Sequence, residues 1–203
     1  MFTLQLNSCY FYTLIREAIL VIINLLKKPL QDLLMKFDSG DAGILHDAPA
    51  TLEECSVVLL VCIRQSTDLN AIEKLLPQAK LHFKKASVLA LYTGIAKPPL
   101  SSDQVPVFSL NDFTFLGHPN KRLTELFSNL NADILISLNR CNSGMHKQFV
   151  RQMPASLKAG IYHPVFSNLF HFMLELDDQK YPSSSILDHF VHYLKNIKLN
   201  VHE

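Results

Sequence analysis

The hydrophobic positions of this chain change their period several times between residues 56 and 197. Short continuous apolar runs, typical of strands covered on both faces, alternate with stretches in which apolar residues recur every three or four positions. The runs predict strands at 56–63, 87–92, 132–138, 157–162 and 172–176, with a further short strand at 106–110. The stripes predict helices at 68–83, 121–130, 145–153 and 185–197. Pro77 should kink or split the first of these helices.

Strands that alternate with helices at this spacing indicate a parallel sheet with helices on both faces. We therefore predict a single Rossmann-like α/β domain, doubly wound and mainly parallel, with about five strands. Residues 36–54 mix Gly, Asp and Pro and read as a linker. The predicted organisation is an apolar helical extension at 1–35, the linker at 36–54 and the α/β domain at 55–203.

The amino-terminal extension has an apolar stretch over residues 9–28 that Arg16 and Glu17 interrupt. A spanning helix needs about 20 largely uncharged residues, and this stretch is too short for that. Lys27 and Lys28 follow the apolar run, whereas an export signal has its positive charges first. Three interpretations stay open: a helix packed on the domain, a segment lying on the membrane surface, or a poorly defined start upstream of Met35.

The charge and cysteine content narrow the functional classes. Nineteen basic and 18 acidic residues leave a formal net charge of +1, which provides no basic face for nucleic acid. The four cysteines lie far apart with no CxxC pair, at positions 9, 55, 62 and 141. This usage favours reduced, structural thiols. We expect a cytoplasmic protein, membrane-peripheral only if residues 9–28 lie on a membrane.

Residues 108–139 distinguish this chain from other α/β proteins, because they join a turn-rich aromatic element, DFTFLGHP, to a helix and a buried strand. Three further segments matter for comparison with known families: ADILI at 132–136, KAGIY at 158–162 and HYL at 192–194. Their order resembles an uncharacterised Bacteroidota family that is known as a domain of unknown function. The resemblance covers roughly residues 30–197. Ile63-Arg64 stands where that family has an acidic residue after its first strand, so we expect no acid-dependent role there.

The latter half of the chain is also similar in layout to the acceptor-side half of heptosyltransferase-type glycosyltransferases. The shared order is a strand like ADILISLN, a helix, a strand like LKAGIYHP and a strand like HFMLELD. The similarity implies an alternative function, a degenerate or half glycosyltransferase-like enzyme. Because the chain ends at Glu203, we expect a second subunit to supply the nucleotide-sugar-binding lobe. Fold does not imply function, so we favour a non-catalytic domain that binds a protein partner or a small anionic ligand.

Polar residues after the first predicted strand are candidates for ligand binding. Arg64, Ser66 and Thr67 precede a helix, where exposed backbone amides and a guanidinium can hold an anion. Alternatively, Ser66 or Thr67 caps the helix and Arg64 is solvated. The phosphate-binding motifs GxGxxG and GxxxxGK[ST] do not occur in the chain.

A second group of candidates follows later strands. Asn139 and Arg140 would lie beside the first group if their strands are neighbours, and both suit polar or phosphate recognition. Both are also common in turns. His163 stands at the end of another strand and is a further candidate ligand-binding residue.

The aromatic element is a candidate partner-binding site through Asp112, Phe113, Phe115 and His118. In an extended segment the two rings would point to one side. Exposed aromatic patches mark contact sites, but aromatic pairs more often fill cores. The alternative is therefore that both rings anchor the loop at the edge of the sheet.

Catalytic and metal chemistry have weaker support. His189 and His192 lie three positions apart on the last predicted helix, but the HEXXH motif and a third ligand at defined spacing do not occur. Cys141 has no basic partner that the sequence can assign. His146 is a possible cleft residue. We expect no catalytic residue, no metal and no cofactor.

Overall fold

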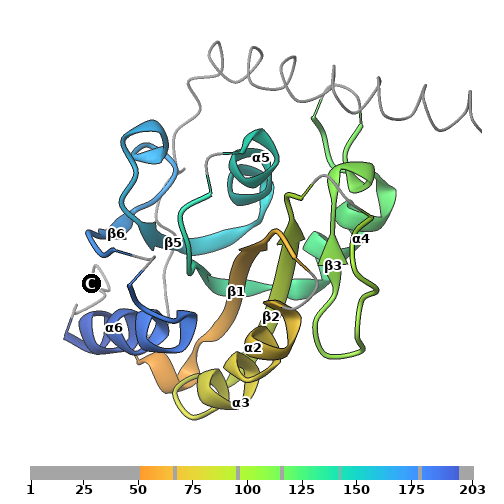
Figure 1. Cartoon of the computed structure of the whole chain (residues 1–203). Coiled ribbons are helices and arrows are strands. Elements are labelled where there is room, and N and C mark those ends of the chain that lie inside the picture. Colours follow the sequence, from red (N-terminus) through yellow and green to blue (C-terminus); the bar gives the residue numbers. More distant parts are fainter. Residues whose placement is uncertain are drawn as a thin grey trace, which may run out of the picture. The chain divides into compact units, whose positions relative to one another are not determined.

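The computed structural model describes residues 51–65, 68–94, 97–114, 117–141, 143–177 and 180–196. Within them, six parallel strands form one sheet in the order β3-β2-β1-β4-β5-β6 (Figure 1). The strands are β1 (Ser56–Ile63), β2 (Lys85–Tyr92), β3 (Val107–Phe108), β4 (Ala132–Ser137), β5 (Ala155–Ile161) and β6 (Phe172–Leu174). The predicted doubly wound α/β fold is confirmed. The sheet has six strands rather than about five because Val107–Phe108 pairs with β2.

The β1 strand lies at the centre of this sheet, paired with β2 over its whole length and with β4 from Val57 to Leu60. Helices cover both of its faces, so most of its side chains are shielded from water. Six of its eight residues are buried, which explains why the sequence SVVLLVCI is an apolar run without alternation.

Two hydrophobic clusters divide the core between the faces of the sheet. Val57, Leu59 and Val61 of β1 point to one face, which α2 (Leu69–Glu73), α3 (Leu75–Lys80) and α6 (Ser183–Asn196) cover. Val58 and Leu60 point to the other face, towards α4 (Lys121–Leu130) and α5 (Gly144–Gln152). Figure 1 shows α2 and α3 beside β1 and β2.

The predicted helix at 68–83 is split into α2 and α3 at Lys74, three residues before Pro77. The position of the break follows from the chemistry of proline. Pro77 has no N–H to donate to the carbonyl of Glu73, and its ring would clash with that carbonyl in a continuous helix. The α2 helix therefore ends at Glu73, and Pro77 occupies the first turn of α3, where no donor is needed.

The α4 helix has the predicted bounds, and its two ends explain why. The Asn120 side chain accepts a hydrogen bond from the Leu123 N–H at 3.0 Å and caps the first turn. Asn131 ends the helix in the left-handed conformation, with φ at 35°, which asparagine tolerates better than most residues. The chain then enters β4 directly at Ala132.

The close approach of Phe170 to β5 gives a prediction. A Cβ added at Gly160 would lie 2.6 to 2.9 Å from three ring carbons of Phe170, whose ring is buried in the second cluster. Gly160→Ala should therefore force the ring out of its packed position and lower the free energy of unfolding by about 1–3 kcal/mol, measured by urea denaturation.

The matched control is the double variant Gly160→Ala/Phe170→Leu, in which the ring is gone. Its loss should be smaller than the sum of the two single losses, because the clash cannot occur. Additive losses would contradict the packing described for Gly160.

Candidate functional site

The strand order of the sheet reverses between β1 and β4. From β1 the chain proceeds outward to β2 and β3, then returns to β4 and continues to β5 and β6. The connections after β1 and β4 diverge, because α2 packs on one face and α5 on the other. Ligands of open α/β sheets bind at the carboxyl ends of the strands at such a point. This edge of the sheet is the candidate site.

Asn139 holds the ends of the two strands together at this edge. Its side-chain amide donates to the Cys62 carbonyl at 2.6 Å, and its Oδ1 accepts from the Cys62 N–H at 2.9 Å. The backbone N–H of Leu138 also donates to the Leu60 carbonyl at 3.0 Å. The pairing of β1 with β4 thus continues past Ser137 through a side chain. The amide that the sequence assigned to a ligand is already bonded to the backbone of β1.

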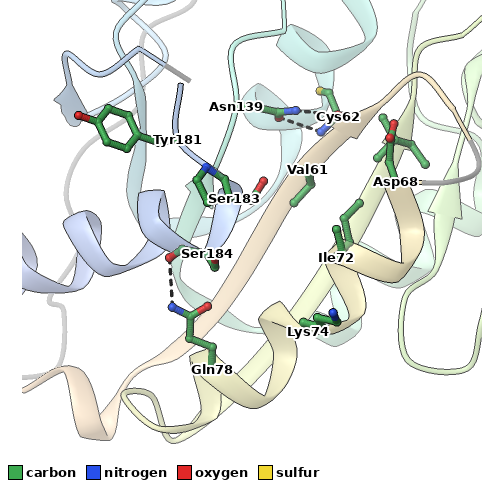
Figure 2. Close-up of a pocket in the computed structure, with 13 residues that line it drawn as sticks. Val61, Cys62, Asp68, Ile72, Lys74, Gln78, Asn139, Tyr181, Ser183 and Ser184 are labelled. Carbon is green, nitrogen blue, oxygen red and sulfur yellow. Dashed lines mark hydrogen bonds between the residues drawn. The ribbon is translucent and has the colours of Figure 1, made fainter. Parts of the chain in front are cut away.

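A pocket of about 520 Å³ lies on the α2, α3 and α6 side of this edge (Figure 2). The residues around it come from the end of β1, from α2 and α3, from Asn139 and from the segment 181–184. Gln78 of α3 donates to the Ser184 carbonyl at 3.1 Å and to a carboxylate oxygen of Asp188 at 2.7 Å. These bonds tie α3 to the first turns of α6 beside the pocket, and Figure 2 shows the one to Ser184.

The loop after β1 does not offer its amides to a ligand. The Asp68 carboxylate accepts hydrogen bonds from the backbone N–H of Gln65 at 3.1 Å and of Arg64 at 3.3 Å. The chain's own carboxylate therefore occupies the position that the sequence assigned to an anion. The Arg64 side chain is exposed, and Ser66 and Thr67 lie outside the described residues.

The other two predicted ligand residues point elsewhere. The Arg140 guanidinium donates to the Leu176 carbonyl at 2.7 Å, which ties the β4–α5 loop to the segment after β6. The His163 ring packs against Phe166, with 5.0 Å between the ring centroids, on the face that α5 covers. Neither Arg140 nor His163 is among the described residues that line the pocket.

Sequence reasoning missed the contribution of α6 to the pocket. The helix begins at Ser183, two residues earlier than predicted, and Pro182, Ser183 and Ser184 all line the pocket. Proline followed by serines is a common helix start, so a signal was present. What the sequence did not indicate is that this start packs beside β1.

The aromatic element is built around a buried carboxylate. Asp112 accepts a hydrogen bond from the Ser109 N–H at 2.8 Å in a capping box, and its other oxygen lies 3.3 Å from the Arg122 guanidinium. Phe113 is 4% exposed and packs in the second hydrophobic cluster. Both residues are thus engaged within the domain, which favours the interpretation that they anchor the loop.

The turn that follows presents a different residue to solvent. The Thr114 N–H donates to the His118 carbonyl at 2.7 Å, and Gly117 has φ at 84°, which only glycine adopts readily. His118 is exposed, and Phe115 lies outside the described residues. Of the predicted partner-binding residues that the structure describes, only His118 has an exposed side chain. Partner binding by this loop stays a prediction.

Charging the buried ring tests its role. Phe113→Asp should lower the free energy of unfolding by at least the 3–5 kcal/mol that removal of a core phenylalanine typically costs, because an unpaired carboxylate would also be buried. His118→Asp, on the same loop but exposed, is the matched control and should change stability by less than about 0.5 kcal/mol. Equal stability of the two variants in urea denaturation would show that Phe113 is not part of the core.

A serine–histidine pair is buried beneath the candidate site. Ser137 Oγ and His146 Nε2 are 2.8 Å apart, and the two residues are 1% and 2% exposed. His146 Nδ1 has no hydrogen-bond partner among the described residues. Burial lowers the pKa of His146 to about 4, the carbonyl of Cys141 opposes this shift and His163 adds to it. The imidazole is neutral at pH 7 and has no access to a substrate.

This burial predicts a dependence of stability on pH. The unfolded chain takes up a proton on His146 near 6.5, whereas the folded protein takes it up only near pH 4. Stability is therefore lost as pH falls from 6.5 to 4, by about 3 kcal/mol in all. His146→Gln, which can still bond Ser137 but does not titrate, should lose correspondingly less between pH 7 and pH 4 in urea denaturation. Parallel pH profiles for the two proteins would contradict the assignment.

No group of three or more His, Cys, Asp or Glu side chains with a geometry suited to a metal ion occurs in the part of the chain that the structure describes. The His189 ring contacts Tyr181, with 5.8 Å between the ring centroids, and His192 contacts Tyr193 at 5.3 Å. A search of the same residues for helices able to cross a bilayer finds none that is long and apolar enough.

The strand order and the pocket at the strand ends define this class of protein as a Rossmann-type α/β domain. The chain belongs to a family of unknown function, DUF6913, whose model matches residues 48–197. The match confirms the resemblance to a domain of unknown function. None of the curated proteins matches the chain significantly.

Among solved structures, the chain is similar to the glycosyl transferase family 9 protein from Veillonella parvula DSM 2008. The identity is 14% and the TM-score is 0.47. The similarity covers 76% of this chain and 44% of that one, so the chain spans less than half the length of the solved protein. The likeness concerns the layout of the fold alone.

Proposed function

We propose that this domain binds a small anionic molecule in the pocket between the carboxyl end of β1, α2 and the start of α6. The observation that carries the proposal is the position of the pocket. A hollow of about 520 Å³ lies where the strand order reverses, and its size is within the range of small-molecule sites. This is the place where open α/β sheets bind their ligands.

The charges around the pocket support an anion rather than a cation. Lys74 lines the pocket with an exposed side chain and makes no ion pair within the described residues. Asp68 also lines it, but its carboxylate already accepts two backbone hydrogen bonds. The amides and hydroxyls of Ser183 and Ser184 stand at the positive end of a 14-residue helix.

The apolar part of the lining indicates that the ligand is more than an inorganic ion. The apolar part of the lining consists of Val61, Ile63, Ala71 and Ile72. A ligand with an anionic group and a less polar body matches this division. A mononucleotide or a phosphorylated metabolite has this chemistry. The alternatives of a half glycosyltransferase-like enzyme and of a peripheral membrane protein acting through residues 9–28 stay predictions.

Binding should be measured by isothermal titration calorimetry with three probes: inorganic phosphate, ADP and UDP-glucose. We expect ADP or UDP-glucose to bind more tightly than phosphate, because both place an apolar or aromatic body against the valine and isoleucine wall. UDP-glucose binding with no ADP binding would favour the glycosyltransferase-like alternative.

Lys74→Glu should weaken the tightest probe by at least about tenfold, because it replaces an attractive charge at the pocket with a repulsive one. Lys80→Glu makes the same change of net charge at an exposed position outside the pocket and is the matched control. Equal weakening by both variants, or no binding of any probe at millimolar concentration, would overturn the proposal.

A further inference from the structure

One aromatic side chain borders the pocket. Among the described residues that line it, Tyr181 is the only one with an aromatic ring. Five large hydrophobic side chains are exposed in the part of the chain that the structure describes, and Tyr181, at 44% exposure, is the only one of them at the pocket. An exposed ring at the border of a pocket is a surface that a bound molecule can cover.

Local hydrogen bonds hold the backbone on both sides of Tyr181. Before it, the Lys180 N–H donates to the Asp177 carbonyl at 3.0 Å, and the Lys180 ammonium lies 3.0 Å from the Asp177 carboxylate. After it, the Pro182 carbonyl accepts a hydrogen bond from the Ile186 N–H at 3.1 Å at the start of α6. A proline also biases the residue before it, here Tyr181, towards extended backbone conformations. The ring is thus attached to a constrained segment.

A second ring restricts the orientation of the Tyr181 side chain. The His189 ring of α6 lies with its centroid 5.8 Å from that of Tyr181, and the two planes are at 81°. Such edge-to-face contacts are a favoured arrangement of aromatic rings. The contact covers only part of the tyrosine, because nearly half of the residue remains exposed. Tyr181 therefore presents an oriented ring to the pocket.

An exposed and oriented tyrosine ring favours a flat aromatic group as its ligand. Aromatic rings attract one another in offset stacks, and this attraction adds to the effect of burying apolar area. For nucleic-acid bases, replacing the stacking side chain with alanine weakens binding by about five- to 150-fold per base. A saturated group of the same size lacks the π-face that this contact requires.

The same pocket offers a cation to a negatively charged group. Lys74, between α2 and α3, lines the pocket with an exposed side chain, and the Ser183 and Ser184 residues line it beside Tyr181. Figure 2 shows Tyr181 and Ser183 on the side of α6, and Lys74 on the side of α2 and α3. An aromatic ring and a cation thus border one pocket from different elements.

We propose that the ligand of this pocket is a phosphorylated compound with a planar aromatic ring, as nucleotides are, and that Tyr181 selects it by stacking on that ring. This inference rests on the proposed binding of a small anionic molecule, and it decides between the two kinds of ligand named there. A phosphorylated metabolite without an aromatic ring leaves the Tyr181 ring exposed and binds more weakly. Tyr181 is therefore a specificity-determining residue.

AMP and ribose 5-phosphate are matched probes, because both contain ribose and phosphate and only AMP carries an aromatic base. In isothermal titration calorimetry with the full-length chain, AMP should bind at least about fivefold more tightly than ribose 5-phosphate. Equal affinities would overturn this inference and leave the proposed anion binding intact. If neither compound binds and inorganic phosphate does not bind either, both proposals are wrong.

Variants of Tyr181 test the contact itself. Tyr181→Ala should weaken AMP binding at least about fivefold and leave the affinity for ribose 5-phosphate unchanged, whereas Tyr181→Phe keeps the ring and should retain AMP binding. Tyr193→Ala is the matched control, because Tyr193 is 47% exposed on α6 but does not line the pocket. It should change neither affinity. An unchanged midpoint of urea denaturation should confirm that each variant is folded.

Two results with these variants would contradict the inference. Equal weakening of AMP and ribose 5-phosphate by Tyr181→Ala would show that the ring shapes the pocket without stacking on the ligand. Unchanged AMP binding by Tyr181→Ala would show that the adenine lies elsewhere. The comparison of the two probes on the unaltered chain needs no variant, so it decides the question even if a variant fails to fold.

Discussion

The parallel pairing of β1 with β4 is the interaction on which the other features of this domain depend. It joins segments about 75 residues apart, and side chains secure it at both ends. At the amino end of β1, Asp133 accepts hydrogen bonds from the backbone N–H and the hydroxyl of Ser56, both at 2.7 Å. At the carboxyl end, the Asn139 amide bonds both backbone groups of Cys62. Long-range pairing costs chain entropy, and these bonds help to offset it where the ladder alone would fray.

The same pairing places the chemistry of the domain at one edge of the sheet. It sets the ends of β1 and β4 side by side while their connections leave to opposite faces, which opens the pocket on the side of α2 and α6. Asn139 bonds the end of β1 at this edge and also lines the pocket.

Local chemistry explains most differences between prediction and structure. The Asp68 carboxylate accepts hydrogen bonds from the backbone amides of Arg64 and Gln65. From the sequence alone, the amides of this loop were expected to be available to an anion. The sequence placed Asp112 and Phe113 at a possible surface, whereas a capping box and the second cluster engage them within the domain. These differences arise because short polar side chains readily form hydrogen bonds with nearby backbone groups of their own chain. The spacing of hydrophobic residues in the sequence does not show which hydrogen-bond partner a polar group will have.

The sequence by itself determined the elements and their class: the apolar run of β1, the caps that bound α4, and the break that Pro77 imposes between α2 and α3. These depend on the backbone geometry and side-chain period of neighbouring residues, which a single sequence contains. Only the tertiary structure decided which loops share an edge and that α6 starts beside β1. Those facts depend on the order of the strands, and contacts between residues distant in the chain are set by the packing of whole elements.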